Sequence, residues 1–166
     1  MPVTVGVNSL SVVHMASGGV TIAFPDVCKT PAVPSPVPIP YPNVALSVDT
    51  AMGSKQVKCD GNPICLNDSF FKMSTGDEAG SVGGVASGMV KGKAEFILYS
   101  FDVKVEGKSV PRLADLMVQN KGGSPNTPPF PLVQPPAVVV VLPDPDEDAS
   151  EDDVEIATLE EGPPED

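Results

Sequence analysis

Prolines at every second position between residues 34 and 42 restrict this chain more than any other feature of its sequence. Each proline fixes its own φ angle and lacks the N–H group that a helix or a β-ladder needs. The segment therefore cannot be a helix or a central strand, and we expect a rigid, polyproline-like strap that lies across a strand. Ile39 and Tyr41 would pack the strap on its own domain, and the alternative is a Pro-x-x-Pro ligand for another protein.

Glycine and proline together account for 35 of the 166 residues, so turns must be frequent and long helices rare. The chain has no Trp and only eight other aromatic residues, so its core must be largely aliphatic. Runs of β-branched residues predict short strands, and residues 74–93, which hold six glycines, predict a long loop. We predict a mainly β fold of short strands and hairpins with long turns.

Three short segments predict the tight turns of this fold. They are Asn8-Ser9, Asp60-Gly61-Asn62-Pro63 and Glu106-Gly107-Lys108. The first and the last of them lie between strand-like segments, so we expect a hairpin at each.

Negative charge is concentrated at the end of the chain. The net charge is −12, and the segment from Asp144 to Asp166 holds 12 acids and no base, whereas residues 1–143 hold 10 acids and 10 bases. A neutral body does not attract phosphate backbones, so we expect no nucleic-acid partner. Residues 122–145 contain eight prolines. We therefore predict a domain at residues 1–121 and a proline-rich and acidic, flexible C-terminal tail at residues 122–166.

One strip of the predicted tail, Ala137 to Leu142, is apolar and β-prone. It would pair with an open sheet edge on this protein or on a partner, or it is only a linker, and the sequence leaves both open. We expect the preceding prolines to hold this strip away from the core. At six residues it is far shorter than the roughly 20 that span a bilayer, so we expect no stable membrane insertion.

The beginning of the chain has no Lys or Arg before Lys29, and so it lacks the charged region of a secretory signal peptide. We therefore expect the protein to be made and folded in the cytoplasm. Its three cysteines are an odd number in a reducing compartment, which argues against a disulfide framework.

Four side chains are candidate metal ligands: His14, Cys28, Cys59 and Cys65. One imidazole and three thiolates would suit a tetrahedral structural zinc. A turn at residues 61–63 would place Cys59 opposite Cys65 across a hairpin, with both sulfurs on one face. The favoured alternative is that the cysteines are small core residues and that His14 is hydrogen-bonded near a turn. We predict no cofactor, with zinc absent or substoichiometric.

The sequence offers few groups for catalysis. His14 is the single histidine, and the chain lacks the Gly-x-Ser-x-Gly turn of a serine nucleophile. Asp77 and Glu78 are adjacent, so on a strand their carboxylates would point to opposite faces. We expect Asp77 to accept hydrogen bonds from loop amides, and we predict that the protein is not an enzyme.

Four segments match one family in sequence order. They are residues 24–31 (FPDVCKTP), 36–43 (PVPIPYPN), 74–80 (STGDEAG) and 99–107 (YSFDVKVEG). These segments resemble the PAAR-like domain of bacterial type VI secretion, and the resemblance runs from about Met1 to Asn120. It implies a small β-rich cone that caps the trimeric VgrG spike, sharpens it and carries or recruits effector toxins.

The resemblance therefore predicts a non-enzymatic structural tip protein with the VgrG spike trimer as its partner. An effector toxin or its chaperone would bind through the C-terminal tail. The protein would stay in the cytoplasm until firing and would then be secreted into the medium or the target cell. The alternative is an effector adaptor or chaperone-like binding module, in which the acidic tail is the main functional surface and the β domain only its mount.

Overall fold

The computed structural model describes residues 3–138. The acidic segment from Asp144 to Asp166, and residues 139–142 of the β-prone strip, lie outside the described residues. The predictions made for those segments are therefore not addressed by the structure.

The described part of the chain is mainly β, as predicted, and contains no α-helix. No helix in this part is long and apolar enough to cross a bilayer. Its elements, in chain order, are β1 (Gly6–Val7), β2 (Leu10–Ser11), β3 (Val20–Thr30), β4 (Val37–Leu46), the 3-10 turn η1 (Ser47–Asp49), β5 (Thr50–Ala51), β6 (Lys58–Cys59), β7 (Asn62–Pro63), β8 (Phe70–Phe71), β9 (Gly83–Gly84), β10 (Lys93–Phe96), β11 (Lys104–Val105), β12 (Lys108–Ser109), β13 (Leu116–Lys121) and β14 (Phe130–Pro131).

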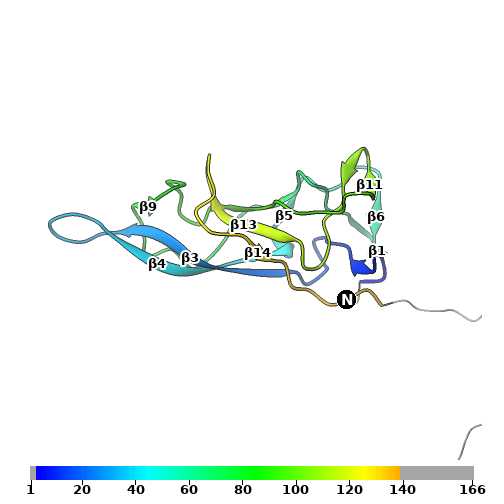
Figure 1. The fold of residues 1–166 in the computed structure, drawn as a ribbon, viewed down its shortest axis with the longest axis horizontal. Coiled ribbons are helices and arrows are strands. Elements are labelled where there is room, and N and C mark those ends of the chain that lie inside the picture. The colour runs from blue at the N-terminus through cyan, green and yellow to red at the C-terminus, as the bar shows by residue number, and fades with distance from the viewer. Residues whose placement is uncertain (1–2, 139–166) are drawn as a thin grey trace, which may run out of the picture.

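The two longest strands, β3 and β4, form an antiparallel hairpin that runs along most of the molecule (Figure 1). With β9 they make a three-stranded sheet in the order β4-β3-β9. A second sheet has the order β14-β13-β10-β8-β5. In Figure 1 the hairpin forms the lower layer, and β13 and β5 lie above it.

The predicted proline strap is the edge strand β4. Val44 donates its N–H to Thr75 O at 2.8 Å, on the edge of β4 that faces away from β3. Because backbone N–H groups alternate along a strand, Pro38, Pro40 and Pro42 place their nitrogens on that same outer edge. The prolines therefore remove no N–H donor from the β3–β4 pairing. They leave the outer edge of β4 without the N–H donors that another strand would need.

The main hydrophobic core lies between β4 and the five-stranded sheet. Its fully buried centre includes Phe71 and Phe96, whose rings meet edge to face with centroids 5.8 Å apart. The whole cluster consists of Val13, Ala45, Cys65, Phe71, Ala94, Phe96, Met117 and Leu132. Most of the buried hydrophobic residues in the described part of the chain are Val, Ile, Leu or Ala, as the composition predicted.

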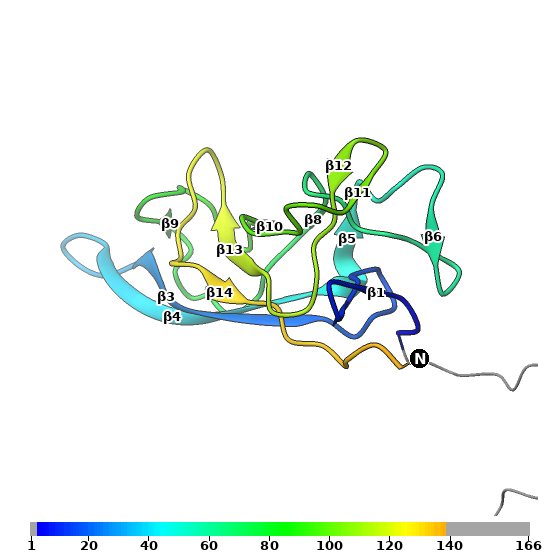
Figure 2. The same cartoon turned by 45° about the vertical axis from the view of Figure 1, so that its right-hand side comes forward.

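Three two-residue hairpin turns lie at the opposite end of the molecule from the β3–β4 loop (Figure 2). Each turn has two consecutive residues with positive φ: Asn8-Ser9, Asp60-Gly61 and Glu106-Gly107. This is the backbone of a type I′ turn, whose twist matches that of the strands it joins. The hairpins β1–β2, β6–β7 and β11–β12 surround a second core cluster, formed by Val3, Val12, Cys59, Ile64, Leu66 and Val110.

The turns at Asn8 and Glu106 were predicted correctly, but the register of the middle hairpin was not. The turn residues are Asp60 and Gly61, so Cys59 pairs with Asn62 and does not face Cys65. The physical reason is that the Asp-Gly pair adopts positive φ at both positions, whereas Pro63 cannot.

The chain does not leave the domain at Gly122, where we expected the tail to begin. β14 pairs with β13, Val133 bridges Val20, and Ala137 bridges Val3. Leu132 is completely buried. Buried and exposed residues alternate from Phe130 to Gln134, so an extended segment rich in prolines still packs as an edge strand. The first residues of the predicted strip, 137 and 138, are therefore attached to the body and not held away from it.

The centre of the main core allows a test of the fold. Replacing Phe71 by Ala removes a completely buried ring and should lower the free energy of unfolding by about 3 to 5 kcal/mol. Urea unfolding followed by circular dichroism measures the change. Phe101→Ala is the matched control, because Phe101 is 86 % exposed and should change the midpoint little. Equal losses in the two variants would contradict this packing.

Candidate functional site

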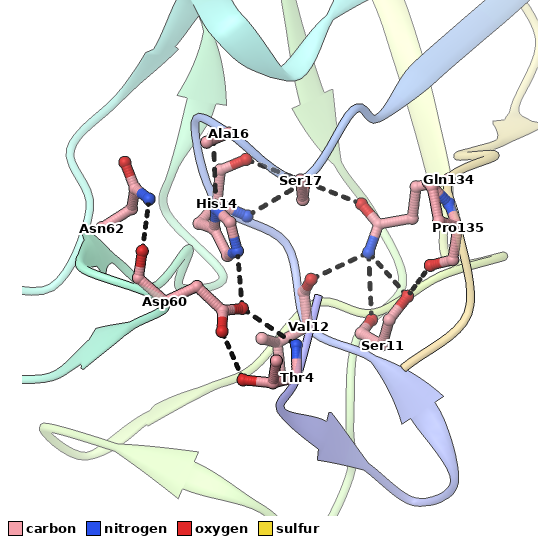
Figure 3. A network of polar contacts seen from close by, with 10 residues as sticks. All are labelled: Thr4, Ser11, Val12, His14, Ala16, Ser17, Asp60, Asn62, Gln134 and Pro135. Carbon is pink, nitrogen blue, oxygen red and sulfur yellow. Dashed lines mark hydrogen bonds and ion pairs between the residues drawn. The ribbon is translucent and has the colours of Figure 1, made fainter. Parts of the chain in front are cut away.

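His14 is completely buried beside the β6–β7 hairpin (Figure 3). Its Nδ1 accepts the N–H of Ala16 at 3.2 Å, so in the neutral ring the proton lies on Nε2. Nε2 lies 3.2 Å from Oδ2 of Asp60 and donates to it. Both ring nitrogens are thus used in hydrogen bonds near a turn, and neither is directed at a cysteine.

Asp60 joins three separate parts of the chain. Besides His14, its carboxylate accepts the backbone N–H of Thr4 at 3.0 Å and the hydroxyl of Thr4. These hydrogen bonds hold the pKa of Asp60 below its usual value, and the bond from the Thr4 hydroxyl has the largest effect. The carboxylate therefore ties the N-terminal segment to the His14 loop and the β6–β7 hairpin.

Gln134 forms the other half of the network in Figure 3. Its amide nitrogen, Nε2, donates to Ser11 Oγ and Val12 O at 2.8 Å, and its Oε1 accepts from Ser17 Oγ at 2.9 Å. Because Gln134 is buried, these bonds fix the segment after Gly122 against the start of the chain. The network as a whole is a structural clamp.

The four residues predicted to bind zinc do not share one site in the part of the chain that the structure describes. Cys59 packs in the second core cluster and Cys65 in the main one. His14 is engaged with Asp60. Of the four, Cys28 alone belongs to a group of three potential metal ligands within residues 3–138.

Cys28 lies between two buried carboxylates, those of Asp26 and Asp77. Its Sγ is 3.5 Å from Asp26 Oδ1 and 3.8 Å from Asp77 Oδ2. One ligand atom from each of the three residues lies within 4.8 Å of the others, and all three residues are completely buried. We call these three residues the Asp26 cluster.

A β-bulge brings two members of the Asp26 cluster to the inner face of β3. The register of β3 against β4 shifts between Ala23 and Asp26. Before the shift Ala23 faces inward and Ile22 outward, and after it Asp26 and Cys28 face inward. An extra residue in a strand reverses which side its later side chains face, so without the bulge Asp26 and Cys28 would lie on the outer face.

Three asparagines surround Asp26. Asn43 Nδ2 donates to Asp26 Oδ2 at 2.8 Å, Asn120 Nδ2 lies 3.2 Å from Oδ1, and Asn126 Nδ2 also donates to Oδ1. Two of these amides are oriented by the backbone. Asn120 Oδ1 accepts the N–H of Gly92 at 2.8 Å, and Asn126 Oδ1 accepts the N–H of Ala86 at 2.8 Å.

The Asp26 cluster holds three acidic groups close together and buried from water. Burial, together with the charges of Asp26 and Asp77, raises the pKa of the Cys28 thiol to about 12. Burial also raises the pKa of Asp77, although the hydrogen bond from the Lys91 N–H opposes this change. That hydrogen bond confirms the prediction that Asp77 accepts loop amides.

A second feature is an apolar surface on the outer side of the β3–β4 hairpin. Ile22 is 57 % exposed and Val133 is 63 % exposed. They line a hollow of about 300 Å³ together with Val20, Phe130 and Pro131. An adjoining hollow shares Val20 and is lined mainly by Met15, Ala16, Gly18, Gly19, Leu46, Ser47 and Val48. We call these two hollows together the apolar face.

Sequence reasoning missed both Asp26 and the apolar face. Asp26 lay inside the matched segment FPDVCKTP, but its partners Asn43, Asn120 and Asn126 are distant in sequence and carried no recognisable spacing. The alternation of Val20, Ile22 and Phe24 gave a signal for a strand with one apolar side. That side is the exposed one.

The sequence also matches a family of known domains. A family model described as the toxin PAAR-like domain matches residues 19–128, which is more than half of the chain. The chain belongs to the toxin PAAR-like domain family. The matched region begins just before β3 and ends just before β14, so it contains the Asp26 cluster and much of the apolar face.

One relative is the DNase toxin Tse7 of Pseudomonas aeruginosa, which is 42 % identical over 135 residues. The match covers 76 % of this chain and 35 % of the toxin, so the chain spans about a third of the length of that relative. No solved structure matches the chain. Together the family and the relative confirm the resemblance to PAAR-like domains, and they support type VI secretion and effector delivery.

The relative overturns one prediction. We expected a protein that is not an enzyme, and the similarity to a DNase toxin shows that this expectation was wrong, because a nuclease activity has to be considered for the chain. The description as a purely structural protein is corrected for the same reason. The expected absence of a nucleic-acid partner loses its basis as well, since DNA is the substrate named for the relative.

The clamp around Asp60 gives a pH-dependent prediction. Asp60→Asn should lower the free energy of unfolding at pH 7 by about 1 to 2 kcal/mol, because it weakens hydrogen bonds to a charged group. The folded-state pKa of Asp60 lies below its unfolded value. The stabilisation that the ionised Asp60 carboxylate provides is therefore fully present above roughly pH 4, and it is lost as the pH falls through the folded-state pKa.

Urea unfolding at pH 7 and pH 3 tests this dependence. The difference between wild type and Asp60→Asn should shrink at the lower pH. Asp68→Asn is the control, because the Asp68–Lys108 ion pair is exposed and contributes little at either pH. A difference for Asp60→Asn that is the same at both pH values would contradict the assigned role.

Proposed function

We propose that this chain is the spike-associated part of a type VI secretion effector and that it caps the end of the VgrG trimer. The observation that supports this most is the family match over residues 19–128, together with 42 % identity to a DNase toxin. The proposal includes a cytoplasmic stage before firing and transport to the target cell with the spike.

The apolar face is the surface that suits the spike best. Residues 1–143 are electrically neutral, so net charge does not draw this domain to the spike. Apolar area removed from water supplies a contact that does not depend on net charge. Ile22 and Val133 are largely exposed in the chain alone, and both lie beside a hollow that a partner side chain could fill.

This assignment predicts which substitutions weaken capping. Ile22→Asp or Val133→Asp should reduce the affinity for the VgrG trimer about 10-fold to 100-fold, since each removes a buried apolar side chain from the contact. Val33→Asp is the matched control, because Val33 is 99 % exposed in the β3–β4 loop and lies outside the apolar face. Light scattering after gel filtration measures complex formation with each variant.

Salt provides a second test of the same contact. The complex should persist in about 0.5 M salt, where screening acts within roughly 4 to 5 Å and apolar burial remains. Dissociation at that salt concentration, or equal weakening by Val33→Asp, would contradict the apolar contact.

Cargo recruitment by the acidic C-terminal segment is the second part of the proposal, and its favouring observation is the 12 acids without a base between Asp144 and Asp166. The structure determines where a truncation can be made. It has to remove residues only after Val138, because Leu132 and Gln134 are buried in the domain. Removal of residues 139–166 should abolish cargo loading and leave capping intact. Loss of all partner binding would favour the adaptor function in its place.

DNA is the substrate that we propose for the effector, on the basis of the relative alone. Target cells attacked by a strain that carries this chain should show DNA breaks, and deletion of the chain should remove them. Purified chain incubated with supercoiled plasmid and Mg²⁺ then locates the activity: nicked plasmid assigns it to the chain, and intact plasmid assigns it to a partner. Undamaged DNA in the attacked cells would overturn the proposed substrate.

A further inference from the structure

The point at which the chain leaves the described domain is fixed by two backbone contacts. Val138, the last described residue, donates its N–H to Val3 O at 2.8 Å. The residue after Val3 is Thr4, which donates its own N–H to the carboxylate of Asp60 at 3.0 Å. Asp60 is a turn residue of the β6–β7 hairpin. The chain therefore leaves the domain beside this hairpin, at the end of the molecule that carries the three hairpin turns (Figure 2).

The acidic segment from Asp144 to Asp166 begins close to this exit. Asp144 follows Val138 by six residues, and six residues span at most about 20 Å when fully extended. The segment carries 12 acids and no base. Its charge is therefore tethered within a short reach of the hairpin turns.

Three exposed lysines lie at the same end of the molecule and form no ion pair with another described residue. They are Lys55, Lys58 and Lys104, which we call the hairpin lysines. Lys58 lies in β6, two residues before Asp60. Lys104 lies in β11, two residues before Glu106, and the Glu106 carboxylate accepts the backbone N–H of Lys55 at 3.0 Å. The three lysines thus lie around two adjoining hairpins.

The carboxylates nearest to the hairpin lysines are bound by neutral donors of the domain. Asp60 accepts hydrogen bonds from Thr4, Asp102 from Asn8 and Ser100, and Glu106 from Ser54 and the backbone N–H groups of Lys55 and Gln56. These donors orient the carboxylates without neutralising a lysine. The ammonium groups of the hairpin lysines therefore remain available to further carboxylates.

Proximity favours the carboxylates of the same chain over those of another molecule. A short linker presents a tethered group to its neighbour at an effective concentration in the millimolar range. A single pair between exposed charges is weak, so several acids have to share the three lysines. With 12 acids in 23 residues, the segment supplies enough carboxylates for such sharing.

We propose that the acidic segment from Asp144 to Asp166 binds the hairpin lysines of its own chain. The contact consists of exchanging ion pairs at the surface, and salt weakens it. It keeps the acidic segment at the hairpin end of the domain, away from the β3–β4 loop. A partner with a larger basic surface would displace the lysines. Because the contact forms within one chain, its test needs neither VgrG nor cargo, and its failure would leave the proposed function standing.

The test uses the untagged full-length chain and a water-soluble carbodiimide, which joins a carboxylate to a lysine amine in contact with it. Peptide mass spectrometry locates each cross-link. We expect residues 144–166 to be joined to the hairpin lysines at least about 5-fold more often than to Lys29. Lys29 is the matched internal control, because it is exposed, forms no ion pair with a described residue and lies near the β3–β4 loop.

Two changes should reduce these cross-links. About 0.5 M salt should lower their yield at least about 3-fold, since the charges are exposed to solvent. Replacing all three hairpin lysines by Gln should lower the yield of cross-links to residues 144–166 by a similar factor, whereas Lys29→Gln should leave it unchanged. The substituted side chains are exposed, so the variants should fold, and circular dichroism checks this.

Three results would overturn the proposal. The first is a reaction that joins Lys108 to Asp68, which are paired in the structure, but joins no hairpin lysine to residues 144–166. The second is equal joining of the segment to Lys29 and to the hairpin lysines. The third comes from a mixture of chains labelled with ¹⁴N and ¹⁵N, in which cross-links that combine both isotopes would assign the segment to a second copy.

Discussion

The antiparallel pairing of β3 with β4 is the interaction on which the other parts of the structure depend. Nine residue pairs hold the two strands together, interrupted by the bulge between Ala23 and Asp26. The main core packs on the inner side of this hairpin, and β9, Val133 and Thr75 attach along its edges. The pairing tolerates the prolines of β4 because the nitrogens of Pro38, Pro40 and Pro42 lie on the outer edge of that strand. Alternate spacing is thus the condition that makes so proline-rich a segment a strand.

The sequence was sufficient for features that depend on neighbouring residues. Asn8-Ser9 and Glu106-Gly107 specify their turns through local backbone preference, and the prolines excluded a central strand. The register at Cys59 was wrong because two turns of different length fit the same four residues, and only the positive φ of Asp60 and Gly61 selects between them. The family resemblance was confirmed because its motifs are themselves local segments.

Features that join distant residues could not be predicted. Asp26 meets Asn43, Asn120 and Asn126 across separations of 17, 94 and 100 residues, and no periodicity in the sequence relates them. The predicted domain boundary after Lys121 also depended on contacts with residues far away in the sequence. Proline content indicated a tail, but whether Leu132 and Gln134 are buried depends on Ser11, Val12 and Ser17, which lie more than 100 residues earlier in the chain.

The bulge in β3 separates two kinds of surface on one strand. Ile22 faces outward and contributes to the apolar face, whereas Asp26 and Cys28 face the interior and contribute to the Asp26 cluster. A strand without the bulge would place the two acidic groups on the outer side, where they would interrupt an apolar contact with a partner. The same distortion therefore removes charge from the outer surface and concentrates it where neutral amides surround it. Burial of Asp26 at the bulge thus keeps its carboxylate off the outer side of β3, where Ile22 contributes to the apolar face.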